Sequence, residues 1–266
     1  MTDLRERQTT WPEVAAAPSF MAATAAVYAG QLARARTARG PLLFVATLQS
    51  LGIVVLLRGV VRDDGAVTAS AIVAGSTVLV AAFVGLNLLA QRFGALRAQG
   101  ALDYYAALPI SGGSVVLGTT ASYATFAIPG ALLTAVVGAA MYGLSFSHLW
   151  LALPTMVVAG IALSAVGAAI GLLLPRPELA TVAGQLAMTA VLFLGVIPPG
   201  HMPAGVRGLR DVLPSTYAVD ALTAALRGHP SVGGQIWRLA VTAGYAAIAL
   251  ALASRSFRRA VDRPRG

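Results

Sequence analysis

Long runs without charged residues recur along this chain. Five of them cover residues 40–57, 65–91, 104–175, 179–206 and 239–254, in which Asp, Glu and Arg are absent. A charged side chain at the centre of a bilayer costs about 2.5–3.5 kcal/mol, so such runs are typical of membrane-embedded helices. Because one crossing needs about 20 residues, the run at 104–175 has room for more than one.

The segment at 142–148, Tyr-Gly-Leu-Ser-Phe-Ser-His, divides that longest run with glycine and turn-forming residues. Six spans result, and the pattern predicts an all-α polytopic membrane protein. We expect the spans at about 41–57, 67–90, 113–141, 149–174, 180–198 and 235–254. The expected parts of the chain are a cytoplasmic N-terminal segment at 1–40, a transmembrane domain at 41–254 and a basic cytoplasmic tail at 255–266.

An alanine-rich segment at 20–37 predicts a helix before the first span. Met21, Tyr28 and Leu32 form one stripe on it, and Gly40-Pro41 is expected to break it. Such a helix either lies along the cytoplasmic membrane interface or is an ordinary solvated lead-in.

The loop that starts at Gln91, after the second span, predicts a short helix with an apolar face. Leu102, Tyr105 and Leu108 recur at helical spacing, and Pro109 ends the run. An apolar face in a cytoplasmic loop either enters the membrane surface or receives a partner protein. We favour docking of a partner.

A third segment lies between Pro214 and Gly228, where Val219, Leu222 and Leu226 form a helical stripe. It is too short and too polar to cross a bilayer. We expect a re-entrant or surface helix at the outer mouth of the protein, shielded by its neighbours.

The charges are few and all basic ones are arginine. Charged residues make up 11% of the 266 residues, against roughly 25% in soluble domains, while 57% are hydrophobic. Six spans put both termini on one side, and 13 of the 19 arginines then share that side, which the positive-inside rule makes cytoplasmic. We expect the first span to direct insertion without a cleaved signal peptide. The arginine- and alanine-rich composition favours a GC-rich bacterial source and the inner membrane.

Several chemistries are excluded by residues that are missing. No cysteine means no disulfide or thiolate nucleophile, and no lysine means no phosphate-binding loop in this chain. The predicted spans contain no Asp, Glu or His, which argues against an intramembrane enzyme. The three histidines, His148, His201 and His229, are far apart, so we expect no metal site. The basic residues lie between the spans, so nucleic acid is not an expected partner.

Polar residues within or near the spans are candidates for the substrate path, with ordinary hydrogen bonding between helices as the alternative. These candidates are Gln49, Asn87, Tyr123, Thr125 and Gln185.

Two motifs add a resemblance to this picture. Residues 97–111 read R-x-x-G-x-L-x-x-x-x-x-L-P-I-S, and residues 213–222 read L-P-x-T-Y-x-V-D-A-L. With six spans and a helix before the first, this order resembles the permease subunits of type-2 ABC exporters, including those that export drugs and antibiotics. The likeness covers about residues 20–255.

The resemblance implies that the loop between spans two and three is a coupling helix, which docks on a separate ATPase subunit. Its implied contact residues are Gly100, Leu102, Asp103, Tyr104, Tyr105, Leu108 and Pro109, and the external motif comprises Leu213, Pro214, Thr216, Tyr217 and Asp220. Many relatives carry an acidic cluster before this helix, whereas Gln91, Arg92 and Arg97 stand here.

By the same resemblance, two permease copies, or this chain and a sister permease, assemble in the lipid membrane with ATPase subunits that hold ATP and Mg²⁺. This chain itself is expected to hold no cofactor and to catalyse no reaction. The low aromatic content, 7%, favours a hydrophobic or amphipathic small molecule over a saccharide as the substrate. A secondary transporter driven by protons or ions is the alternative, although such proteins usually carry intramembrane ionisable groups.

Overall fold

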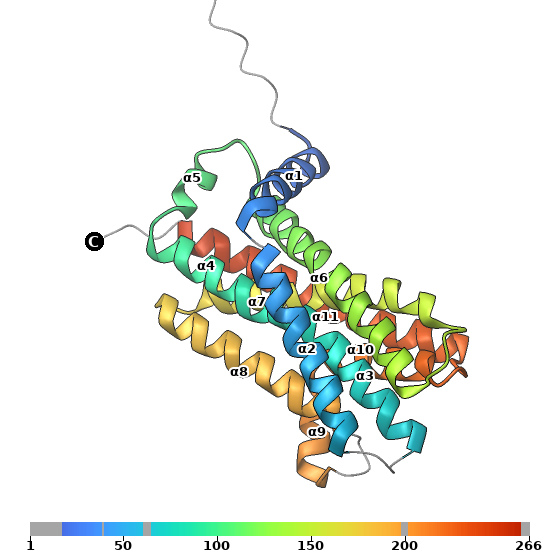
Figure 1. The fold of residues 1–266 in the computed structure, drawn as a ribbon. Coiled ribbons are helices and arrows are strands. Elements are labelled where there is room, and N and C mark those ends of the chain that lie inside the picture. Colours follow the sequence, from blue (N-terminus) through green and yellow to red (C-terminus); the bar gives the residue numbers. More distant parts are fainter. Residues whose placement is uncertain (1–17, 39, 61–64, 198–201, 262–266) are drawn as a thin grey trace, which may run out of the picture.

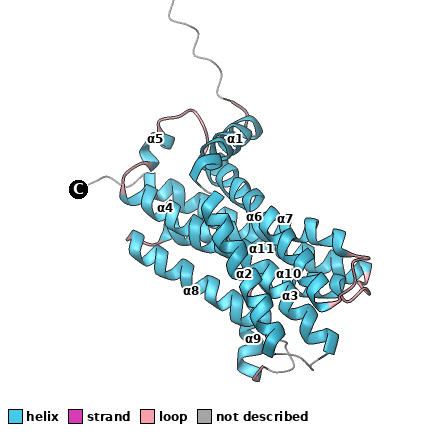
Figure 2. Ribbon diagram, in the orientation of Figure 1, coloured by secondary structure: helices cyan, strands magenta, loops and turns pink. Residues whose placement is uncertain are grey.

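A computed structural model describes residues 18–38, 40–60, 65–197 and 202–261. Within these ranges the chain forms helices joined by short connections and contains no strand (Figure 2). α1 and α5 lie at one end of the helical bundle, near the C-terminal end of α11, and the connection between α6 and α7 lies at the other end (Figure 1). The all-α fold expected from the sequence is confirmed.

The helices follow one another along the chain with short connections. Their bounds are α1 Phe20–Ala38, α2 Gly40–Val60, α3 Gly65–Ala82, η1 Phe83–Leu88, α4 Leu89–Ala98, α5 Leu102–Ala106, α6 Gly112–Tyr142, η2 Leu149–Leu151, α7 Ala152–Leu173, α8 Pro177–Val196, α9 Ala204–Val212, α10 Pro214–Leu226 and α11 Val232–Val261. The η1 segment is a π-helix that continues α3 into α4 without a break.

Five of these helical stretches are long and apolar enough to cross a membrane. They are Ala66–Ala98, Gly112–Tyr142, Leu149–Leu173, Pro177–Gly195 and Val232–Val261, and α2 adds a shorter apolar stretch at Leu43–Gly59. The chain is therefore a membrane-embedded protein that crosses the bilayer several times.

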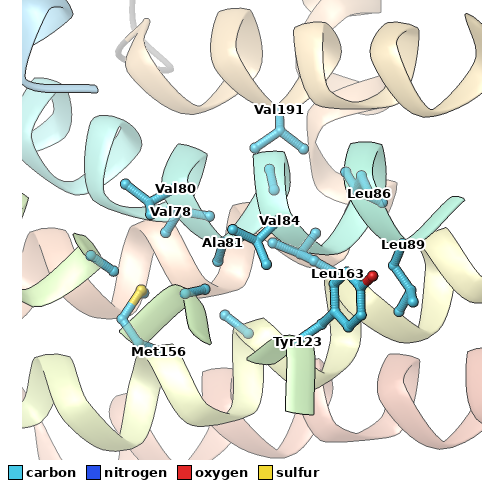
Figure 3. Packing of buried hydrophobic residues seen from close by; sticks show 14 of the residues in the cluster. Val78, Val80, Ala81, Val84, Leu86, Leu89, Tyr123, Met156, Leu163 and Val191 are labelled. Atoms are coloured by element: carbon cyan, nitrogen blue, oxygen red, sulfur yellow. The ribbon is translucent and has the colours of Figure 1, made fainter. Parts of the chain in front are cut away.

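The centre of the bundle is formed by α3, η1 and α7. Val84 of η1 lies beside Leu163 of α7, and Met156 of α7, Tyr123 of α6 and Val191 of α8 belong to the same buried cluster (Figure 3). Alanine, glycine and valine dominate elsewhere in the core, which lets the helices pack closely where lipid supplies no hydrophobic driving force.

Two glycines of α7 permit the closest contact in this core. A Cβ atom at Gly167 would lie 2.0 Å from the carbonyl oxygen of Gly85, and one at Gly171 would lie 2.5 Å from that of Ala90. The Gly167-Ala-Ala-Ile-Gly171 sequence thus brings α7 against η1 and α4 of the same chain.

Some helix ends differ from the sequence-based expectations. The helix of the second span continues to Ala98, where a loop was expected from Gln91, because Arg97 Nη1 donates to the carbonyls of Leu172 and Leu174 at 2.8 and 2.9 Å. These bonds satisfy carbonyls at the end of α7 that no helical N–H reaches. The C-terminal basic tail, expected from residue 255, is helical as far as Val261.

Candidate functional site

The turn before α5 is built around Gly100. This residue has φ 69°, a left-handed conformation that glycine adopts without steric cost. The N–H of Ala101 donates to the carbonyl of Leu96 at 2.9 Å, which closes the end of α4. Leu102, only 3% exposed, then anchors α5 in the core. Ser111 ends the segment and caps α6 through a hydrogen bond from the N–H of Ser114 at 3.1 Å.

α5 and the turn after it carry exposed apolar residues. Tyr104 is 63% exposed, and Leu108 and Pro109 are also exposed, as is Asp103 in the first turn. The predicted stripe of Leu102, Tyr105 and Leu108 is therefore divided: Leu102 is buried and Tyr105 is half-buried, while Leu108 faces outward. We call Tyr104, Leu108 and Pro109 the α5 surface.

Tyr105 ties α5 to α1. Its hydroxyl accepts a hydrogen bond from Gln31 Nε2 at 3.4 Å, and its ring meets that of Tyr104 edge to face at 5.6 Å between centroids. Between α1 and the α5 segment lies a cavity of about 300 Å³, lined by Val27, Gln31 and Tyr105 and also by the three residues of the α5 surface. The hydrogen bond between Gln31 and Tyr105 thus links the two helices across this cavity.

The face of α1 that packs inward matches the expected stripe only in part. Tyr28 and Leu32 of that stripe are half-buried, but Met21 is 70% exposed, and Ala23, Val27 and Gln31 pack inward as well. The reason is the close contact with α6, where a Cβ at Gly118 would lie 2.7 Å from the carbonyl oxygen of Thr24. Only small side chains fit such an approach.

The five candidate residues for a substrate path do not form one site. Asn87 is buried in η1, where it accepts a hydrogen bond from Gln91 Nε2 at 2.6 Å. Tyr123 is buried in the central cluster, and the hydroxyl of Thr125 bonds that of Tyr28 at 3.1 Å (Figure 3). Gln49 and Gln185 are instead exposed on the outer faces of α2 and α8.

The external motif holds α9 and α10 together. Arg210, 5% exposed, forms an ion pair with Asp220, and the Thr216 hydroxyl donates to the Arg210 carbonyl. Pro214 stands in the first turn of α10, where its missing N–H costs nothing. α10 packs against α3, α7 and α11, so it is the short shielded helix expected from the sequence.

Tyr217 completes this connection. Its hydroxyl donates to the Asp211 carbonyl at 3.0 Å. The pKa of Tyr217 is raised above its ordinary value of 10.0, mainly by burial of the hydroxyl. The nearby Tyr245, Asp211 and Asp220 raise it further. The hydroxyl therefore stays neutral, and able to donate, at every physiological pH.

Two contacts near the motifs were not foreseen from the sequence. Arg97 was noted in a motif and among the residues that replace an acidic cluster, yet it joins the ends of α4 and α7 beside α5. Arg210 was not singled out, yet it is the buried partner of Asp220. Within the described ranges, no cluster of His, Asp or Glu could hold a metal ion, and His201 lies outside those ranges.

The family model for the ABC-2 type transporter membrane domain matches residues 25–226, from within α1 to the end of α10. The match covers more than half of the chain, and this protein therefore belongs to the ABC-2 type transporter family. Membrane domains of this family are subunits of transporters, not catalysts, and membership implies association with an ABC ATPase subunit. No curated protein sequence matches the chain.

Proposed function

We propose that this chain is the permease of an ABC exporter and forms the translocation path for a hydrophobic or amphipathic small molecule, such as an antibiotic, a drug or a lipid-like compound. A separate ATPase subunit binds and hydrolyses ATP with Mg²⁺. The complete transporter contains two permeases, either two copies of this chain or this chain with a sister permease.

The α5 surface is the observation that carries this proposal. Tyr104 is exposed on a short helix at one end of the bundle, and Leu108 and Pro109 are exposed in the turn that follows it. Asp103 lies beside Tyr104, and its charge does not enter a membrane readily. The anchors beneath them are fixed, since Leu102 is buried and Arg97 joins α4 to α7. An apolar surface on a rigid support is suited to receiving an ATPase and to transmitting its movement.

The outer faces of α2 and α8 support the pairing of permeases. Gln49 and Gln185 lie near the middle of these helices, and both are exposed in a single chain. An amide facing lipid at that depth lacks hydrogen-bond partners and costs free energy. A second permease, or a water-filled path between the two permeases, would supply the missing partners.

The distribution of arginine supports a cytoplasmic position for the α5 end and for both termini, in a bacterial inner membrane. Arg92, Arg97 and Arg176 lie at this end, as do Arg255 and Arg258 of α11. Translocation then runs from this end toward the end where α9 and α10 lie.

The test is co-purification with the candidate ATPase subunit encoded near this protein. Tyr104→Asp places a charge in the α5 surface without disturbing a buried residue. We expect it to weaken recovery of the ATPase at least about tenfold, because exposed tyrosines at interfaces are frequent hot spots. Leu102→Asp would instead test folding, since Leu102 is buried.

Phe146→Asp is the matched control. Phe146 is an exposed aromatic residue, 51% accessible, in the connection between α6 and α7 at the opposite end of the bundle. Its replacement should leave the ATPase bound. Equal recovery with folded Tyr104→Asp would contradict the docking role of α5, and transport by this chain without any ATPase would favour a secondary transporter.

A further inference from the structure

A cavity of about 220 Å³ lies between the first turns of α3, the end of α8, and helices α10 and α11. It is at the end of the bundle opposite α5, and neither sequence motif nor family match assigns a ligand to it. Three arginines line it, one each from α9, the end of α10 and α11: Arg210, Arg227 and Arg238. Asp220 is the single carboxylate among its lining residues.

The positive charge of the cavity is only partly neutralised. Asp220 accepts hydrogen bonds from both terminal nitrogens of Arg210, at 3.4 Å from Nη1 and closer to Nη2. Asp211 lies 3.9 Å from Arg210 Nη1, but its side chain is 63% exposed and outside the cavity lining. Arg227 and Arg238 form no ion pair with any residue in the described ranges. Among the residues that the structure describes, the cavity lining therefore carries excess positive charge.

Buried donors in the cavity wall also lack partners. Arg210 is 95% buried, and its Nε atom is fully buried without a hydrogen-bond acceptor; the hydroxyl of Thr223 is in the same condition. An unpaired buried donor costs roughly 1–3 kcal/mol, more when it is charged. Both atoms are closed off from the cavity in this structure, so an acceptor bound there would satisfy them only after a shift of the wall.

The rest of the wall is apolar. Val67 and Ala71 of α3, Ile197 after α8, and Val219 of α10 contribute hydrocarbon surface. Ala71 is six residues from the start of α3, or about 9 Å along its axis. The cavity thus joins a cationic region to an apolar wall near one end of an apolar helix.

We propose that this cavity binds the phosphate group of an anionic ligand, with the arginines as donors and the apolar wall against the adjoining hydrocarbon. Arginine suits this role because its planar guanidinium offers paired donors to phosphate oxygens. The ligand is either a phosphate-bearing amphiphile, such as a lipid, or free phosphate. The inference concerns binding alone and does not depend on the direction of transport or on the ATPase.

The experiment measures ligand binding to the purified full chain in a neutral detergent. The probes are dioctanoyl phosphatidate, dioctanoyl phosphatidylcholine, which has the same chains but no net charge, and inorganic phosphate. Calorimetric titration gives Kd, and the shift in thermal unfolding gives an independent measure of binding to the folded state. We expect saturable binding of phosphatidate and none of phosphatidylcholine in the same concentration range.

Two sets of variants move the affinity in opposite directions. Arg227→Gln with Arg238→Gln should weaken phosphatidate binding at least about tenfold, because charge-assisted hydrogen bonds are lost. Asp220→Asn should tighten it several-fold, because it frees Arg210 from its carboxylate. Arg58→Gln with Arg207→Gln is the matched control, since it removes the same net charge from residues outside the cavity lining and should leave Kd unchanged.

Each outcome decides the proposal. Tighter binding of phosphatidate than of inorganic phosphate identifies an amphiphile as the ligand, and equal binding identifies the free anion. Absence of saturable binding, equal binding of phosphatidylcholine, or an unchanged Kd in the arginine double variant would overturn the site. If the arginine double variant does not fold, Asp220→Asn decides the question alone. If the Asp220 carboxylate had only a structural role, its removal would not tighten the binding of phosphatidate.

Discussion

Gly167 occupies a position that no other residue fits. The Cβ of an alanine there would lie 2.0 Å from the carbonyl oxygen of Gly85, and it would meet the backbone of Leu86 as well. Backbone atoms cannot rotate away as a side chain does, so α7 and η1 would have to separate. The π-helical turn of η1 lies directly at this contact, and its geometry depends on the approach.

Gly167→Ala is therefore expected to lower the stability of the folded protein by about 1–3 kcal/mol, the usual cost of overpacking a core. The measurement is thermal unfolding of the purified chain in detergent. Gly244→Ala on α11 is the control, because nothing lies within 4 Å of a Cβ there and alanine favours a helix. Similar melting temperatures for the two variants would contradict the close approach of α7 and η1.

The position of α1 depends on small residues. It packs on α6 through Ala23 and Val27, and the hydroxyls of Tyr28 and Thr125 meet at 3.1 Å. Gly118 allows this approach, since a Cβ there would lie 2.7 Å from a carbonyl of α1. The position of α1 bears in turn on α5 through the bond between Gln31 and Tyr105.

A cysteine pair tests this arrangement directly, because the chain contains no cysteine of its own. In the Tyr28→Cys, Thr125→Cys double variant, a short bismaleimide should join the two cysteines within one chain. The cross-link is detected by mobility on denaturing gels after a protease cut between the two sites. Adding Gly118→Leu should reduce the yield at least severalfold, because leucine displaces α1. An unchanged yield would place α1 elsewhere than against α6.

The sequence predicted the helices of the membrane domain better than their ends. Charge-free runs identify the part of a helix that lies in lipid, but a helix continues past arginine wherever the guanidinium finds acceptors, as Arg97 does at the end of α7. Helix α10 was predicted from its stripe and Pro214 because both signals are local. The inward packing of Val27 on α1 was not predicted, because its partner Gly118 on α6 is about 90 residues away.

Only part of the candidate site was predicted, because only its local features follow from the sequence. Gly100 and Pro109 delimit α5 through local backbone chemistry, whereas the burial of Leu102 and the exposure of Tyr104 depend on tertiary packing. The pairing of Arg210 with Asp220 joins two helices through a turn that no simple periodicity encodes. Gln49 and Gln185 looked like interior groups, since sequence alone does not say which face of a hydrophobic helix meets lipid.

The two ends of the protein differ in positive charge, because more arginines lie at the α5 end. This difference predicts the orientation of the protein in the membrane. We expect the α5 end to face the cytoplasm. In intact cells that express this chain without its ATPase, a membrane-impermeant maleimide should label Phe146→Cys but not Tyr104→Cys, and Tyr104→Cys should react only after the membrane is opened. Because both positions are exposed, access and not burial decides the result. The reverse pattern would invert the orientation and with it the proposed direction of export.

The helix that runs without interruption from Gly65 to Ala98 is about 50 Å long, well beyond the roughly 30 Å of a hydrocarbon core. It is a rod with the α5 surface just past one end and Val67 and Ala71, in the wall of the arginine-lined cavity, near the other. Its π-helical turn lies between, where a helix bends most readily. If ligand binding in the cavity favours one tilt of this helix, it changes the affinity of the α5 surface for a bound protein by some factor. Thermodynamic linkage then requires that the bound protein change the affinity of the cavity for its ligand by the same factor.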